Sequence, residues 1–157
     1  AVMPTNLYGQ NDNYDNLNSH VLAALIKKIV LAKKQNKNSF IVWGTGKPKR
    51  EFLHVDDLAD ATIKIMNLSK SKYDKVAGEK FPFINVGSGS DISIKDLAKL
   101  ISKIVGFKGK IIFDKSKPDG TFRKLMDDTK LRKIKWKPKI SLNSGIKKTI
   151  EDFKSTI

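Results

Sequence analysis

The chain has two histidines, and their surroundings predict different roles. His20 follows Asn18 and Ser19 in a polar stretch, where a partly exposed imidazole could take up or release a proton near neutral pH. On spacing alone, a purely structural imidazole is an equally good interpretation. His54 stands between apolar neighbours, which favours a structural role. His20 is therefore the candidate for acid–base chemistry.

A second candidate site is the stretch 43–52, which begins with Trp43, continues through a Gly-Thr-Gly turn and includes Arg50. A planar base can stack on indole while a guanidinium holds a phosphate, so this grouping would suit a nucleoside diphosphate. A core tryptophan beside a solvated basic turn is the alternative interpretation.

Asp119 lies in a Lys-Pro-Asp-Gly-Thr turn at 117–121. Its carboxylate could accept hydrogen bonds from two hydroxyls, as from a ribose. On local sequence alone, an ordinary Pro-Asp-Gly turn explains the same residues at least as well.

Several kinds of chemistry are excluded by composition and motif. The chain has no cysteine, so it has no disulfides, thiolate metal sites or cysteine nucleophiles of its own. It also has no Gly-x-Gly-x-x-Gly, no phosphate loop ending in Gly-Lys-Ser/Thr and no His-Glu-x-x-His. We therefore expect no metal site.

The chain is strongly basic, with a formal net charge of +15 over 157 residues. Such a charge raises the possibility of a polyanionic partner. The cations are 28 lysines and only 3 arginines, and the lysines are scattered rather than set in one stripe. Sites that read phosphates or bases by bidentate contacts favour arginine, so a basic nucleic-acid-binding module is the weaker hypothesis and we expect no nucleic-acid partner.

Hydrophobic periodicity predicts a small α+β domain with few, short strands. Three segments are expected to lack regular structure: a loop over 4–18, rich in Asn and Asp, a polar surface connection at 69–80, and a Pro/Gly loop at 115–124. Helices are expected at 20–34, 56–66, 94–105, 127–134 and after Ser141, with a buried face on the second that includes Met66. Strands are expected at 39–43, 51–55, 81–86 and 110–113.

No apolar run approaches the roughly 20 residues that a membrane span needs, and no leader sequence is evident. We therefore expect a cytoplasmic location without membrane contact. The chain opens at Ala1 in a loop-like string with no start methionine, which predicts a piece of a longer protein.

These signals coincide with one family. The strings PTNLYG, NSHV, WGTG, REFLHVDD, INVG and SKPDGT occur in that order from residue 4 to residue 121. Together they closely resemble the C-terminal half of the GDP-L-fucose synthase family, a branch of the extended short-chain dehydrogenase/reductases. The resemblance implies an α/β protein in which residues 1–157 form a single GDP-sugar-binding lobe, while the N-terminal Rossmann half lies upstream.

What the resemblance implies is an NADPH-dependent enzyme that epimerises GDP-4-keto-6-deoxy-D-mannose at C3 and C5 and then reduces C4. His20 matches the family's acid/base histidine and also a cofactor contact. The remaining matches are NADP(H) contacts at Pro4, Thr5, Asn6 and Leu7, and GDP-sugar contacts at Lys28, Trp43, Arg50 and Asp119.

Two positions depart from the family pattern. Lys28 stands where the family usually has arginine, which replaces a bidentate fork with a point charge. Phe122 stands where proline usually follows the Gly-Thr pair, a change that would loosen the loop.

The resemblance also implies that the reductase Ser, the Tyr-x-x-x-Lys pair and a second, cysteine acid lie upstream of Ala1. We therefore expect the isolated chain to be inactive and the full-length protein to be a homodimer. Another nucleotide-sugar epimerase or reductase of the same superfamily is the alternative enzyme.

Overall fold

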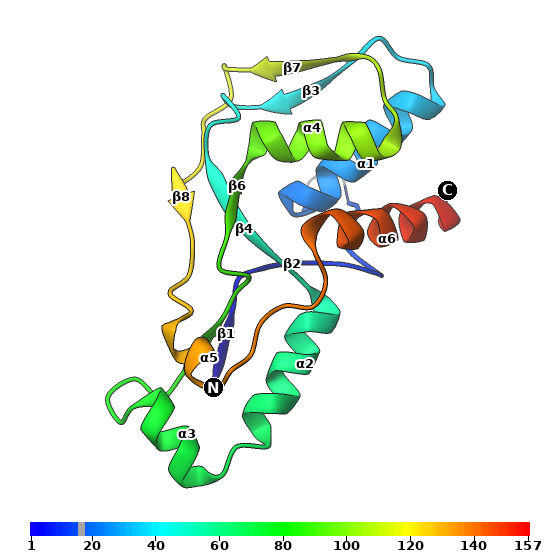
Figure 1. Cartoon of the computed structure of the whole chain (residues 1–157). Coiled ribbons are helices and arrows are strands. Elements are labelled where there is room, and N and C mark those ends of the chain that lie inside the picture. The colour runs from blue at the N-terminus through cyan, green and yellow to red at the C-terminus, as the bar shows by residue number, and fades with distance from the viewer. Residues whose placement is uncertain (16–17) are drawn as a thin grey trace.

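The computed structural model describes residues 1–15 and 18–157, in which two groups of helices lie at opposite ends of a set of short, mostly parallel strands (Figure 1). The strands are β1 (Val2–Pro4), β2 (Asn6–Tyr8), β3 (Ser39–Trp43), β4 (Lys49–His54), β5 (Ile84–Val86), β6 (Asp91–Ser93), β7 (Lys110–Asp114) and β8 (Arg123–Lys124). The helices are α1 (Val21–Lys34), α2 (Val55–Met66), α3 (Lys70–Ala77), α4 (Ile94–Val105), α5 (Thr129–Lys133) and α6 (Leu142–Ser155).

Strand β4 is the centre of the molecule. It pairs in parallel with β2 and β8 and antiparallel with β6. Two further parallel pairs, β1 with β5 and β3 with β7, flank it. In the second of these, Trp43 lies opposite Asp114, so the end of β3 lies beside the start of the loop that carries Asp119.

Two apolar cores hold this arrangement together. The larger lies among α1, α4, α6, β3 and β4, and it buries α1 residues such as Ile26 and Ile29 completely. The smaller lies among α2, α5 and β5, around the almost completely buried Leu53 and Ile84. Because β4 contributes Phe52 to one core and Leu53 to the other, alternate sides of one strand join the two.

The strongest helical patterns are confirmed. Helix α4 spans Ile94–Val105, ends at Gly106 in a left-handed conformation, and begins at Ser93. The Ser93 hydroxyl accepts a hydrogen bond from the Asp96 amide and donates one to the Asp96 carboxylate, which is a reciprocal cap. Ser141 caps α6 as expected.

Other expectations were wrong. The expected loop 4–18 contains the end of β1 and all of β2, because its backbone groups pair with β5 and β4 far away in sequence; its residues 16–17 lie outside the described part of the chain. The surface connection 69–80 contains α3, capped by Ser69. The strand expected at 81–86 is shortened to Ile84–Val86. Met66 is 77% exposed rather than buried.

Candidate functional site

Four of the expected ligand contacts come together around one cavity of about 350 Å³, which we call the Trp43 cavity. Helix α1 supplies Lys28, the end of β3 supplies Trp43, β4 supplies Arg50, and the loop after β7 supplies Asp119. These residues are spread over about ninety positions of sequence, from 28 to 119. The cavity therefore assembles an aromatic plane, two cations and a carboxylate.

Trp43 presents its indole to solvent. It is 62% exposed, because β3 alternates and turns Phe40 and Val42 toward the core while Ile41 and Trp43 point away. The ammonium groups of Lys28 and Lys117 lie 5.2 and 5.7 Å from the ring centroid. The alternative of a core tryptophan is therefore wrong.

Lys28 and Arg50 are held by backbone carbonyls. The Lys28 ammonium donates to the Ile41 carbonyl at 3.3 Å, and burial lowers the pKa of Lys28 from its ordinary value. Arg50 donates through Nη1 to the carbonyl of Thr121 at 2.6 Å. Arg50 thereby connects β4 to the loop that follows Asp119. The same loop is held at Phe122, whose side chain is exposed and whose backbone carbonyl accepts a hydrogen bond from the Lys49 amide.

The remaining expected contacts line a second, more open cavity of about 540 Å³, which we call the His20 cavity. Residues 4–7, at the junction of β1 and β2, form one wall and residues 124–126 form the other. His20 is exposed at the N-terminal cap of α1, and its side chain makes no cap hydrogen bond. An imidazole in this position can exchange a proton with a molecule in the cavity.

A carboxylate lies near this histidine. Burial raises the pKa of Asp12, and the neighbouring charge of His20 partly offsets that effect. One Asp12 oxygen accepts a hydrogen bond from the Asn13 amide at 2.7 Å.

The walls of the His20 cavity can be tested against the nicotinamide cofactor that the family implies. Leu7, Leu125 and Met126 are apolar, and Thr5 and Asn6 are polar, a combination that fits a flat ring carrying an amide. The Asn6 side-chain amide donates to the Glu51 carbonyl at 2.8 Å, which leaves its own oxygen as an acceptor toward a ligand. The described chain therefore fits the nicotinamide end of such a cofactor. It holds no Gly-rich turn for the pyrophosphate.

Sequence analysis missed Glu51, which joins the two walls of the His20 cavity. It is completely buried, and its two carboxylate oxygens accept hydrogen bonds from the amides of Gly89 at 2.7 Å and Met126 at 3.0 Å. A Cβ on Gly87 would overlap this carboxylate. The only sequence signal is an acidic residue between a basic pair and an apolar pair in the stretch 49–53.

His54 is structural in this arrangement. It is 2% exposed, caps α2 by accepting a hydrogen bond from the Asp56 amide at 3.2 Å, and lies edge-on to the Tyr8 ring. It lines neither of the two cavities described above.

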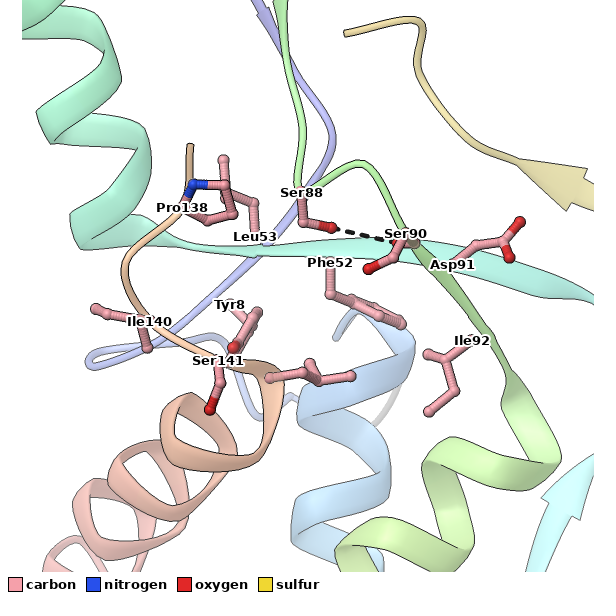
Figure 2. Close-up of a pocket in the computed structure, with 11 residues that line it drawn as sticks. Tyr8, Phe52, Leu53, Ser88, Ser90, Asp91, Ile92, Pro138, Ile140 and Ser141 are labelled. Atoms are coloured by element: carbon pink, nitrogen blue, oxygen red, sulfur yellow. Dashed lines mark hydrogen bonds between the residues drawn. The ribbon is translucent and has the colours of Figure 1, made fainter. Parts of the chain in front are cut away.

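A third cavity of about 350 Å³ lies between β4, the loop from β5 to β6, and the start of α6 (Figure 2). Tyr8, Phe52 and Ile92 form its apolar side, while Ser88 and Ser141 are on its polar side. None of the candidate catalytic or binding residues from the sequence lines it. Across residues 1–15 and 18–157, no cluster of three or more side chains could hold a metal ion, and no helix could cross a membrane.

Comparison with known proteins identifies the family. Residues 1–81, just over half of the chain, match the model of the NAD dependent epimerase/dehydratase family. The chain belongs to this family. Membership confirms the α/β fold class and, with the relatives below, the resemblance to GDP-L-fucose synthases.

Three relatives of this epimerase/dehydratase chain are informative. It is 48% identical over 153 residues to the GDP-L-fucose synthase of Escherichia coli (strain K12), covering 98% of this chain and 48% of that protein. A GDP-6-OMe-4-keto-L-xylo-heptose reductase from C. jejuni has a TM-score of 0.87 at 36% identity, covering 99% of this chain and 53% of the reductase. An NADP-bound GDP-L-fucose synthetase from Naegleria fowleri has a TM-score of 0.84 at 30% identity, covering 99% of this chain and 46% of the synthetase. The chain thus spans about half the length of these relatives.

Proposed function

We propose that this chain is the GDP-sugar-binding lobe of an NADPH-dependent enzyme that converts GDP-4-keto-6-deoxy-D-mannose to GDP-L-fucose. The observation that carries the proposal is the gathering of Lys28, Trp43, Arg50 and Asp119 around one cavity. The E. coli relative supports the choice of substrate, since it is 48% identical to this chain over the 153 aligned residues and is a GDP-L-fucose synthase.

The Trp43 cavity suits the GDP part of the substrate. An exposed indole offers a face for a purine, and Lys28, Lys117 and Arg50 supply cations for a diphosphate. Asp119 supplies a carboxylate for hydroxyl groups, and Thr45 hydrogen bonds lower its pKa, which keeps it ionised.

The His20 cavity suits the sugar part. Hydrogens on C3 and C5 of the 4-keto sugar are acidic because both carbons neighbour the C4 ketone. Each inversion removes one proton and delivers another to the opposite face, and His20 would act as one of the two proton carriers. NADPH, when bound, supplies the hydride for C4, and residues 4–7 would hold its nicotinamide end beside His20.

The rest of the enzyme would come from an upstream half, as the lengths of the relatives suggest. We infer that half to be the Rossmann domain, with the Tyr-x-x-x-Lys pair, the reductase Ser and the cysteine acid. We also propose a cytoplasmic homodimer as the working form.

A second candidate is a reductase for a different GDP-linked keto sugar. The similarity to the C. jejuni heptose reductase supports it, since that protein matches 99% of this chain at a TM-score of 0.87. The two candidates share the GDP part and differ in the sugar, so turnover of each keto sugar by the full-length protein separates them.

Replacing Trp43 tests the nucleotide site. We expect Trp43→Ala to weaken GDP binding to this chain by about 10- to 100-fold, because stacking of a base on an aromatic side chain contributes about 1–3 kcal/mol. Isothermal titration calorimetry with GDP and UDP measures the effect. Phe81→Ala removes an equally exposed aromatic ring outside the cavity and should leave GDP affinity unchanged. Equal affinity for GDP and a random oligonucleotide, lost in high salt, would favour the nucleic-acid module instead.

The isolated chain should have no reductase activity. It lacks the Gly-rich pyrophosphate turn, so it can contact only one end of NADPH. The measurement follows the absorbance of NADPH over time in a mixture of the 157-residue chain and the 4-keto substrate. A substrate-dependent loss of absorbance above the enzyme-free rate would overturn the assignment of hydride-transfer residues to an upstream half.

A further inference from the structure

The turn after β3 closes directly on the Asp119 side chain. Gly44 and Gly46 have positive φ angles of 78° and 74°, which glycine adopts at little cost. A Cβ on Gly44 would overlap an Asp119 carboxylate oxygen, and one on Gly46 would overlap the Phe113 ring. The turn therefore brings the backbone closer to Asp119 than other residues would permit.

Thr45, between these glycines, holds both oxygens of Asp119. Its backbone amide donates to Oδ1 at 2.8 Å, and its hydroxyl donates to Oδ2 at 2.5 Å. The Thr45 hydroxyl oxygen in turn accepts from the Lys47 amide at 3.2 Å, so its one hydrogen is committed to Asp119.

The backbone of the Asp119 loop is held separately. Arg50 donates to the Thr121 carbonyl, the Lys49 amide donates to the Phe122 carbonyl, and Ser116 donates to Asp114 at the other end of the loop. Loss of the Thr45 hydroxyl would therefore release Oδ2 of Asp119 without releasing the loop.

A carboxylate held in this way is prepared for a pair of neighbouring hydroxyls. Each carboxylate oxygen can accept about two hydrogen bonds, so one site on each oxygen remains after Thr45 has bound. Asp119 lines the Trp43 cavity, and fixed orientation of both oxygens matches a vicinal diol better than a freely rotating carboxylate does.

We propose that Thr45 is a positioning residue that orients Asp119 toward the ribose diol of the nucleotide and thereby makes the cavity selective for ribonucleotides over 2′-deoxyribonucleotides. The proposal rests on the function proposed above, in which the Trp43 cavity binds GDP.

The experiment compares GDP with 2′-deoxy-GDP by calorimetric titration of this chain. The unaltered chain should bind GDP about tenfold more tightly, the size of one hydrogen bond to a charged group. Thr45→Val should reduce that preference to about twofold, mainly by weakening GDP binding. Without the Thr45 hydroxyl, Oδ2 of Asp119 is no longer held in place to accept a hydrogen bond from the ribose. Thr45→Ser keeps the hydroxyl and should keep the preference.

Thr156→Val, at the end of α6, is the matched control and should change neither affinity. Thr45→Ala is a second hydroxyl-free variant, and circular dichroism checks that each variant is folded. Equal weakening of GDP and 2′-deoxy-GDP by Thr45→Val, or loss of the preference in Thr45→Ser, would overturn the positioning role while leaving GDP binding intact. An unaltered chain that binds neither nucleotide would overturn the proposed function as well.

Discussion

Replacing His20 with glutamine is expected to lower sugar epimerisation by about 10²- to 10⁴-fold, the usual contribution of a positioned general acid or base. Glutamine keeps the polarity of the side chain but cannot carry a proton. The rate can be measured in a hybrid enzyme that joins the upstream half of the E. coli relative to residues 1–157. Uptake of deuterium from D₂O at C3 and C5, followed by NMR, reports the proton steps without requiring the hydride step.

The same variant carries its own control. His20 lines a different cavity from Trp43, so GDP affinity should stay within about twofold of the unaltered hybrid. If the variant inverts C3 and C5 with deuterium uptake as fast as the unaltered hybrid does, His20 does not carry a proton in this reaction.

Glu51→Gln is expected to lower the free energy of unfolding by about 2–4 kcal/mol. The substitution keeps the volume of the side chain, but an amide offers only one oxygen to the two backbone amides of Gly89 and Met126. The other amide then faces an NH₂ group at a completely buried position, where an unsatisfied donor is costly.

Urea denaturation measures this difference. Glu79→Gln, at an exposed position, is the matched control and should lie within about 0.5 kcal/mol of the original chain. A Glu51 variant as stable as that control would mean that the buried carboxylate contributes nothing to holding these segments together.

Glu51 also links stability to the site. Its carboxylate holds Met126 in one wall of the His20 cavity, and its carbonyl accepts from Asn6 in the opposite wall. Its neighbour on β4, Arg50, reaches the loop of the Trp43 cavity. Strand β4 thus contributes to both cavities, through Glu51 to one and through Arg50 to the other.

Local sequence determined those elements whose hydrogen bonds and caps lie between residues close together in the chain. The periodicity and capping box of 93–106 predicted α4 to within a residue, because a helix satisfies its hydrogen bonds within itself. The β-rich run 39–43 also predicted β3, although the side of the strand on which Trp43 would lie was not readable from it.

The resemblance carried by the motifs supplied the candidate site residues, and these candidates line two cavities in the fold. Only the tertiary structure decided how they are held. Strands β1 and β2 were taken for loop because three-residue strands owe their existence to partners at 84–86 and 52–54. The roles of Glu51 and Thr45 depend on amides and a carboxylate lying 38 to 75 residues away along the chain. The sequence alone therefore determined the candidate residues and every helix except α3. Long-range hydrogen bonds decided the short strands and the geometry of the site, because those bonds join groups whose proximity no local pattern records.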